Sequence, residues 1–362
     1  MRRTALQTVG GVLTLLVASG TATAHVDYVT ESSEPGSVSG LLSAVASSPT
    51  SVAVLAGGAI AVLAVSLGYL RFAGSIPDIE IARETLQSYR PYLPWMLRLS
   101  VGLPLVGAGF AGYLFSPSVP ADARLLQVGM GFLLLFGLAT RPVAAVGLGA
   151  YLVALATNGT PMLLASEYVA GFLAIFLVGP GQPSADMLIR RLVRTDGTVA
   201  SRFRGLATPQ EVLTRVGIGQ GTVPVVLRVF LGLNFIYLGV GQKLLQPGEA
   251  LAVVAKYDLT AVVPVSPELW VVGAGLTEAT VGLAFLAGVF TRGTATVAFV
   301  MLTTTLFGLP DDPVLAHITL FGLTSALMVT GAGRYSLDSA VLPALHRRFS
   351  PPEESPAPAR AD

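Results

Sequence analysis

The chain has 362 residues, of which 52% are hydrophobic and 12% charged, and its mean hydropathy is +0.70. Soluble domains carry roughly 25% charged residues, so this composition predicts an integral membrane protein. The net charge of +1, with arginines scattered between apolar runs, excludes the concentrated basic face that nucleic acid needs. The absence of cysteine excludes thiol–disulfide chemistry, thiolate metal ligation and covalent haem attachment in this chain.

Residues 1–24 have the pattern of a cleavable secretory signal, with Arg2 and Arg3 before an apolar centre and Ala22-Thr23-Ala24 at the end. A retained membrane helix is the alternative, although the apolar centre is shorter than the ~20 residues of a span. Cleavage would expose His25, whose amine and imidazole could chelate a metal such as copper; a terminus without metal is the alternative. Residues 25–51 are rich in Ser, Thr and Gly and predict a flexible extracytoplasmic tether.

Apolar runs along the rest of the chain predict an all-α integral membrane fold with about nine spans after signal removal. A surface helix with charges opposite its apolar residues is expected near 77–89. An Arg-rich connector covers 190–222, and a proline-rich, disordered tail covers 342–362. The predicted spans are 52–72, 97–115, 124–139, 143–157, 162–178, 223–245, 269–290, 294–309 and 313–330.

The positions of the basic residues predict the orientation in the cell membrane. If the segment after the signal is outside, nearly all basic residues fall on the cytoplasmic side of the membrane or at its edge. The exceptions are Arg124, Lys243 and Lys256. The positive-inside rule therefore predicts a multi-pass protein with its mature amino terminus outside and its carboxyl terminus in the cytoplasm.

An internal repeat relates the two halves of the chain. Pro94-Trp-Met-Leu-Arg98 returns as Pro224-Val-Val-Leu-Arg228, and glycines follow each copy at the same spacing. Thr140-Arg141 matches Thr291-Arg292, and Asp186 matches Asp338. The pattern predicts two parallel four-helix transmembrane bundles, in residues 73–189 and 223–341, in addition to the single span 52–72.

These residues resemble the DoxX family of small four-helix membrane proteins. The signature in the second repeat is Arg228, Gly239-Val-Gly-Gln-Lys243, Glu278 with Gly282, Gly288-x-x-Thr291-Arg292 and Gly331-Ala-Gly333-Arg-Tyr-Ser336-Leu-Asp338. The resemblance implies an association with membrane oxidoreductase systems, since related DoxD-type proteins are membrane subunits of thiosulfate:quinone oxidoreductases. It implies a lipid bilayer and a soluble or membrane oxidoreductase as partners.

Residues that both repeats keep are interpreted as architecture. A charge network at the cytoplasmic boundary is expected, with contacts such as Arg228 to Asp338 that also satisfy helix ends. Its members are Arg98, Arg141, Asp186, Arg228, Arg292 and Asp338.

Residues that only the second repeat has are the candidate site. Glu278 replaces Gln127 of the first repeat, and an ionisable residue within a span costs about 2.5 to 3.5 kcal/mol unless it has a partner or a function. At about 1.5 Å per residue, Glu278 and Asn234 lie nearly level within the bilayer. We therefore expect a polar pocket open to the outer leaflet with Glu278 at its floor. Its other candidate members are Asn234, Tyr237, Lys243, Lys256, Tyr257 and His317.

Several interpretations of Glu278 stay open. It could fix helix order by bonding Asn234 and Tyr237 or by pairing with Lys243. It could serve a quinone-handling subunit, in which Glu278 or His317 exchanges a proton with the quinone head group. It could serve proton-coupled or small-molecule transport, or the chain could be a non-catalytic anchor for a soluble redox enzyme. With His317 as the only histidine in a predicted span, a bis-histidine haem within one chain is excluded, so an electron-transfer centre would belong to a partner.

Overall fold

A computed structural model describes residues 36–72, 76–122, 124–203, 220–310, 314–341 and 343–344. Helices dominate these residues, and five of them are long and apolar enough to cross a membrane by length and composition. The protein is therefore an all-α integral membrane protein, as the composition predicted. The proposed signal segment, His25, residues 204–219 of the connector and almost all of the tail lie outside the described residues.

The first repeat consists of four apolar helices and a short outer hairpin. The hairpin is the strand pair in the described part of the chain, and it follows the first helix after the αL residue Gly112. A 3-10 segment precedes the last helix. In chain order these elements are α5 (Leu93–Ala111), β1 (Tyr113–Leu114), β2 (Ser116–Pro120), α6 (Arg124–Phe136), α7 (Thr140–Asn158), η3 (Thr160–Ala165) and α8 (Glu167–Val178).

The second repeat has the same order of helices, with two additions between its first and second helices. The first helix ends in a π-helical segment, and two short helices then stand where the first repeat has its hairpin. The elements are η5 (Gln220–Thr222), α11 (Val223–Ile236), η6 (Tyr237–Leu244), α12 (Pro247–Lys256), α13 (Leu259–Val262), α14 (Pro267–Ala287), α15 (Thr291–Gly308), α16 (Val314–Thr330) and α17 (Leu337–Ala340).

Glycines hold the first two helices of each repeat in close contact. A Cβ added at Gly102 of α5 would lie 3.0 Å from the carbonyl oxygen of Gly131 on α6. In the second repeat, a Cβ at Gly232 of α11 would lie 2.7 Å from the carbonyl oxygen of Gly282 on α14. Small residues let membrane helices approach backbone to backbone, which explains why the repeat keeps these glycines.

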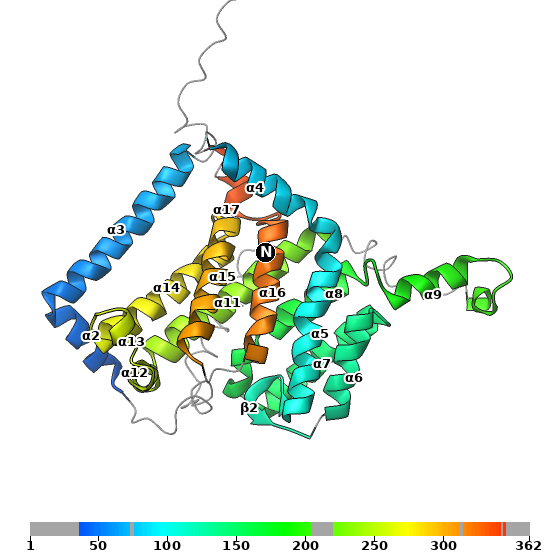
Figure 1. Cartoon of the computed structure of the whole chain (residues 1–362), viewed down its shortest axis with the longest axis horizontal. Coiled ribbons are helices and arrows are strands. Elements are labelled where there is room, and N and C mark those ends of the chain that lie inside the picture. Colours follow the sequence, from blue (N-terminus) through cyan, green and yellow to red (C-terminus); the bar gives the residue numbers. More distant parts are fainter. Residues whose placement is uncertain are drawn as a thin grey trace, which may run out of the picture.

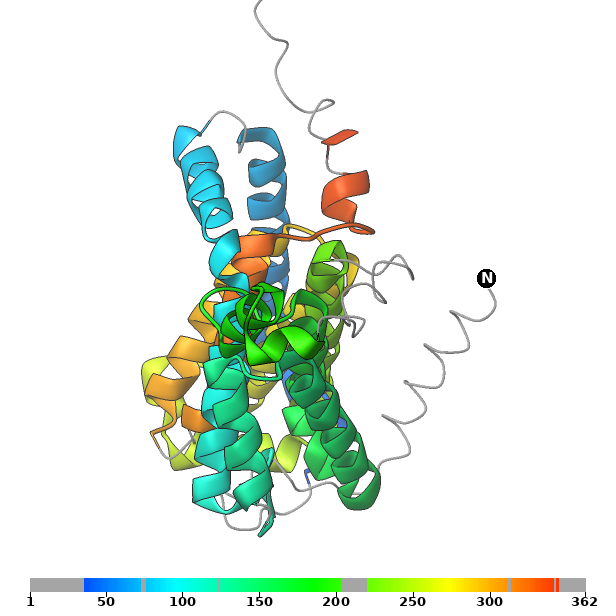
Figure 2. The same cartoon turned by 90° about the vertical axis from the view of Figure 1, so that its right-hand side faces the viewer.

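The two repeats share one continuous core. Helix α5 of the first repeat packs against α16 of the second, and α8 of the first packs against α11 of the second (Figures 1 and 2). Each repeat thus places its first helix against the last helix of the other. Buried residues from both repeats belong to a single cluster, which includes Leu97, Phe172, Phe235 and Leu323. Each four-helix unit therefore covers part of the apolar surface of the other.

Matched arginines make matched contacts at one end of the bundle, which we call the arginine end. Arg141 donates from Nε to the carbonyl of Phe176 at 2.8 Å, and Arg292 donates from Nε to that of Met328 at 2.9 Å. Arg98 donates to the carbonyl of Pro183 at 2.6 Å. Because a guanidinium carries five donors, each arginine can satisfy carbonyls that helix ends leave open.

The expected ion pair between Arg228 and Asp338 is replaced by two sets of backbone contacts. Arg228 donates to the carbonyls of Leu286, at 2.8 Å, and Tyr335. Asp338 accepts instead from the backbone N–H groups of Phe290 and Thr291, at 2.6 and 2.8 Å. Asp186 caps α7 in the same way through Ala139 and Thr140. Arg228 and Asp338 therefore lie at the same end of the bundle, but each forms its hydrogen bonds with main-chain groups.

The segment before the first repeat contains more structure than a flexible tether and one span. Helix α2 (Val38–Ser47) begins at Ser37, whose side chain accepts from the N–H of Gly40. Its buried Leu41 and Val45 pack with residues of α12, α13 and α14. The prediction of a flexible tether is therefore wrong for residues 38–47, because this stretch buries an apolar face that composition alone does not show.

Helix α3 (Pro49–Phe72) stands beside the second repeat and is exposed over almost all of its length (Figure 1). Leu55 packs against the cluster around α2, and the ring of Tyr69 meets Phe290 edge-on with centroids 5.0 Å apart. The surface helix α4 (Pro77–Ser88) then crosses the arginine end and leads through η2 (Arg90–Tyr92) into α5. The exposure of apolar side chains along most of α3 fits a helix that lipid largely surrounds.

Candidate functional site

The π-helical segment η6 positions Lys243 at the end of α11. The backbone N–H of Leu245 donates to the carbonyl of Val240 at 2.9 Å, a bond across five residues. This wider turn lies where Gly239 touches the next helix, since a Cβ there would be 2.4 Å from the carbonyl oxygen of Gly275. Local π-helical turns occur often at functional sites. Here the turn brings the Lys243 side chain toward α14.

Lys243 and Glu278 form an ion pair between η6 and α14. The Lys243 Nζ lies 2.8 Å from Oε1 and 2.7 Å from Oε2 of Glu278, so one ammonium holds both carboxylate oxygens. The two side chains are 24% and 15% exposed. In surroundings of low polarity the attraction offsets the cost of removing both charges from water, and losing one partner leaves the other charge exposed to apolar groups. Lys243 is thus the partner that a charged Glu278 needs within a membrane span.

At the corresponding positions of the first repeat, neutral groups form hydrogen bonds in place of the ion pair. Gln127, at the position of Glu278, donates to the carbonyl of Tyr113 at 2.5 Å and accepts from the N–H of Phe115 at 3.0 Å. Gln127 is completely buried, and its amide fastens the β1–β2 hairpin to α6. The first repeat therefore uses this position for structure, whereas the second holds a charged and partly exposed pair.

Asn234 faces the first repeat. Its side-chain Nδ2 lies 2.9 Å from Oγ of Ser166 and 3.3 Å from Oε2 of Glu167. Tyr237 is buried as well, and its hydroxyl accepts from Nε2 of Gln242 at 2.9 Å. The rise of about 1.5 Å per residue placed Asn234 level with Glu278 along the bundle. It could not show toward which neighbouring helix each side chain points.

Glu167 is a second carboxyl group in the membrane domain, and the sequence reasoning missed it. It begins α8, at the interface with α11, and is 2% exposed. The signal was available, because Glu167 is the acidic residue of the predicted span 162–178 and carries the same insertion cost as Glu278. Glu167 lies in the first repeat, so it is not among the residues that only the second repeat has.

The two short helices α12 and α13 form a lid over the second repeat. Together with the β1–β2 hairpin they mark the lid end of the bundle, opposite the arginine end (Figure 1). Exposed Lys256 places its ammonium 5.1 Å from the ring centre of Tyr257, and Tyr257 packs into the cluster that joins the lid to α2. His317 is buried in α16, with 7% of its surface exposed. Among the described residues, no group of three or more His, Cys, Asp or Glu could hold a metal.

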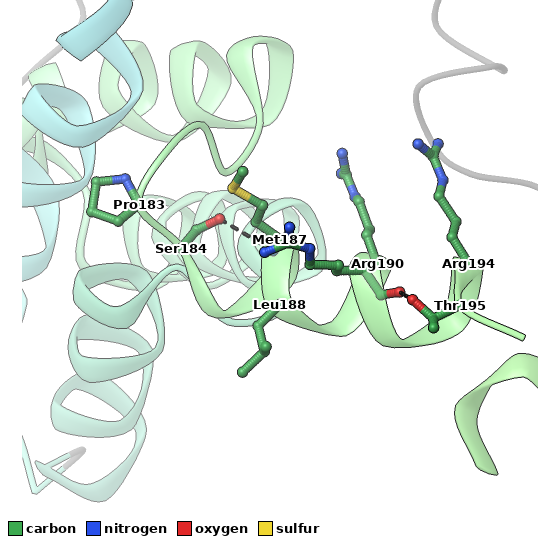
Figure 3. A pocket seen from close by; sticks show the side chains of 8 residues that line it. Pro183, Ser184, Met187, Leu188, Arg190, Arg194 and Thr195 are labelled. Atoms are coloured by element: carbon green, nitrogen blue, oxygen red, sulfur yellow. Dashed lines mark hydrogen bonds between the residues drawn. The ribbon is translucent and has the colours of Figure 1, made fainter. Parts of the chain in front are cut away.

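Helix α9 (Ala185–Arg194) carries a shallow groove at the arginine end. Figure 3 shows Arg190 and Arg194 on one side of the helix and Leu188 on the other. Ser184 caps the helix by accepting from the N–H of Met187 at 3.3 Å. Leu188, Ile189 and Leu192 are all exposed. Such separation of arginines from exposed apolar side chains is typical of a helix at a membrane surface. The 3-10 segment η4 (Val199–Phe203) follows, and α9 with η4 projects from the bundle (Figure 1).

The fold and the site together define a helical multi-pass membrane protein with an ion pair between two helices of its second repeat. Residues 223–310 match the model of the DoxX family. The matched residues contain both Lys243 and Glu278. Comparisons with curated proteins and with solved structures found no match.

Proposed function

We propose that this protein is the membrane subunit of an oxidoreductase system and that its second repeat binds a quinone beside the Lys243–Glu278 pair. The observation that carries the proposal is the pair itself, which is partly exposed and stands where the first repeat has buried, neutral hydrogen bonds. If the pair served only for packing, the second repeat could have the same buried, neutral hydrogen bonds as the first.

The chemistry of the pair suits a quinone head group. The ammonium of Lys243 can donate a hydrogen bond to a quinone carbonyl, and the carboxylate of Glu278 can accept or return a proton as the head group is oxidised or reduced. Leu276 and Leu283 of α14 are exposed, so an isoprenoid tail can pack along this helix outside the bundle. Because the chain lacks cysteine, thiolate-bound redox centres would have to belong to a partner.

A binding measurement with a short-chain quinone tests this proposal. The full-length protein with Trp95→Phe, in lipid nanodiscs, is titrated with decylubiquinone while fluorescence quenching of Trp270, on the same helix as Glu278, is followed. Glu278→Gln and Lys243→Gln should each weaken binding at least about tenfold, which corresponds to the loss of about 1.4 kcal/mol. Glu268→Gln, in the first turn of α14, is the matched control and should bind as the wild type does. Unchanged binding by both site variants would overturn the quinone proposal.

A second candidate function is a non-catalytic anchor for a soluble redox enzyme. The arginine side of α9 favours it, because Arg190, Arg191 and Arg194 line an open groove at the end of the bundle that the positive-inside rule places in the cytoplasm. Purification in mild detergent with identification of bound proteins separates the two functions. Loss of a bound oxidoreductase on changing the three arginines to glutamine, with quinone binding unaffected, would favour the anchor. Proton-coupled transport stays a further proposal for the same carboxylate.

A further inference from the structure

We propose that Glu167 and Asn234 form a second proton-binding site, at the interface between the two repeats, where Glu167 takes up and releases one proton. The site is separate from the Lys243–Glu278 pair and goes beyond the quinone proposal. Glu167 comes from the start of α8 in the first repeat and Asn234 from α11 in the second.

Glu167 receives a hydrogen bond from its own backbone N–H and a long one from Asn234, which is little support for a buried carboxylate anion. Within the described residues, no basic side chain forms an ion pair with it. Its contact with Asn234 Nδ2 is 3.3 Å, whereas hydrogen bonds to an ionised carboxylate are typically about 2.7 to 2.9 Å. A buried charge needs a cation or several donors, so these contacts leave an ionised Glu167 poorly stabilised and favour the uptake of a proton.

Asn234 shows the same mismatch from the other side. Three oxygens surround its Nδ2, from Ser166 at 2.9 Å, Glu167 at 3.3 Å and Leu164 at 3.4 Å, although the amide has two N–H groups. Its Oδ1 is fully buried and has no hydrogen-bond partner among the described residues. A protonated Glu167 supplies a donor for Oδ1 if the amide turns by half a rotation, which gives up the contact between Nδ2 and the carbonyl oxygen of Leu164. Loss of the proton reverses the turn and returns an N–H to the carboxylate.

The proton has a short route to the lid end. Ser166 and Leu164 are partly exposed, while Glu167 next to them is buried. The Ser166 hydroxyl and the Glu167 carboxyl group contact the same Asn234 amide, so water that reaches Ser166 lies close to the carboxyl group, and each release from Glu167 yields one proton to water. No other reactant takes part in the exchange.

The groups around Glu167 are neutral phenols and hydroxyls. Tyr151 of α7 and the adjacent Tyr168 interact electrostatically with Glu167, and Tyr237 of η6 interacts with Tyr151. Helix α16, which packs against α8, carries buried His317 and Thr319. Phenols ordinarily titrate near pH 10, so Tyr151, Tyr168 and Tyr237 are not expected to exchange protons near neutral pH.

Infrared difference spectroscopy on the full-length protein in nanodiscs tests the site. Spectra are recorded between mildly acidic and alkaline pH, and the carboxyl C=O band of a protonated, buried glutamic acid is followed. The wild type should show a band that disappears as the pH rises and that shifts when glutamate is labelled with ¹³C. Glu167→Gln should lose the band, and Glu278→Gln should keep it. Asn234→Leu should keep the band but move its frequency and its titration midpoint.

Three results would overturn the proposal. The first is a wild-type protein without a titrating carboxyl band, and the second is a band that survives in Glu167→Gln. The third is a band lost in Glu278→Gln, which would assign the proton to the Lys243–Glu278 pair. If Glu167→Gln fails to fold, Glu167→Asp serves instead, because an aspartic acid must retain a titrating band at a shifted position. Failure of quinone binding leaves all these outcomes unchanged, so the two proposals fail separately.

Discussion

Lys243 and Glu278 neutralise each other in a region where either charge alone would be costly. Single changes of Lys243 or Glu278 to glutamine should each lower the free energy of unfolding, because each leaves one charge without its counterion. The double change should cost less than the sum of the two by about 1 to 2 kcal/mol, within the range for residues in direct contact. Thermal unfolding in detergent, followed by circular dichroism, measures this difference. Additive effects would show that the contact contributes nothing to stability.

Two glycines at the arginine end are required by the guanidinium groups that lie against them. Gly137 has φ +66°, and a Cβ there would lie 1.8 Å from Nη1 of Arg98. Gly137→Ala should lower the free energy of unfolding by about 1 to 2 kcal/mol for the left-handed backbone alone, and further because Arg98 must move. Gly288→Ala should act in the same direction through Arg228, at 2.8 Å. Gly273→Ala is the control, since its Cβ meets nothing within 4 Å. Equal melting temperatures for all three would contradict this account.

Helix α2 links the start of the described chain to the lid, and two adjacent leucines provide a matched test. Leu41 is 3% exposed and packs in the cluster with Val254 and Leu269, whereas Leu42 is 52% exposed. Leu41→Ala should remove about 2 to 5 kcal/mol of packing and release α2 from the lid. Hydrogen exchange of the amides in residues 38–47 should then become at least tenfold faster. Leu42→Ala should leave the exchange unchanged; similar acceleration in both variants would mean that α2 is not held by this face.

Hydropathy and the internal repeat were sufficient to predict the main helices. The predicted spans correspond to α3, α5 to α8, α11 with η6, and α14 to α16. Helix α2 was not predicted, because its apolar residues lie among Ser and Gly. Their burial depends on contacts with the lid, which is distant in the chain. The π-helical turn was not predicted either, since it depends on the contact of Gly239 with α14. The sequence offered the pairing of Lys243 with Glu278 as one of several interpretations. The direction of the Asn234 side chain could not be predicted, because it depends on how the two repeats pack against each other.

The two repeats depend on each other, because the first helix of each packs against the last helix of the other. A soluble protein could cover such faces with water-driven burial of large side chains. In a bilayer, lipid tails are as apolar as leucine, so close packing of small residues and interhelical hydrogen bonds carry more of the association. The α8–α11 contact contains the Glu167–Asn234 hydrogen bond, and the α5–α16 contact contains a glycine facing a serine. The interface is therefore polar on one side and tightly packed on the other.

The tightly packed side gives a test of the whole arrangement. A Cβ at Gly322 of α16 would lie 1.7 Å from Oγ and 2.3 Å from Cβ of Ser100 on α5, so Gly322→Ala should force the two helices apart. Overpacking of this kind typically costs about 1 to 3 kcal/mol. Ser100→Gly removes both clashing atoms, and the double variant should recover most of the melting temperature that Gly322→Ala loses. Ser100→Gly together with Gly137→Ala is the control, since the second clash lies at the arginine end with Arg98 and should not be relieved. Absence of rescue in the first pair would mean that α5 and α16 do not meet at these residues, and the interlocked arrangement of the repeats would be wrong.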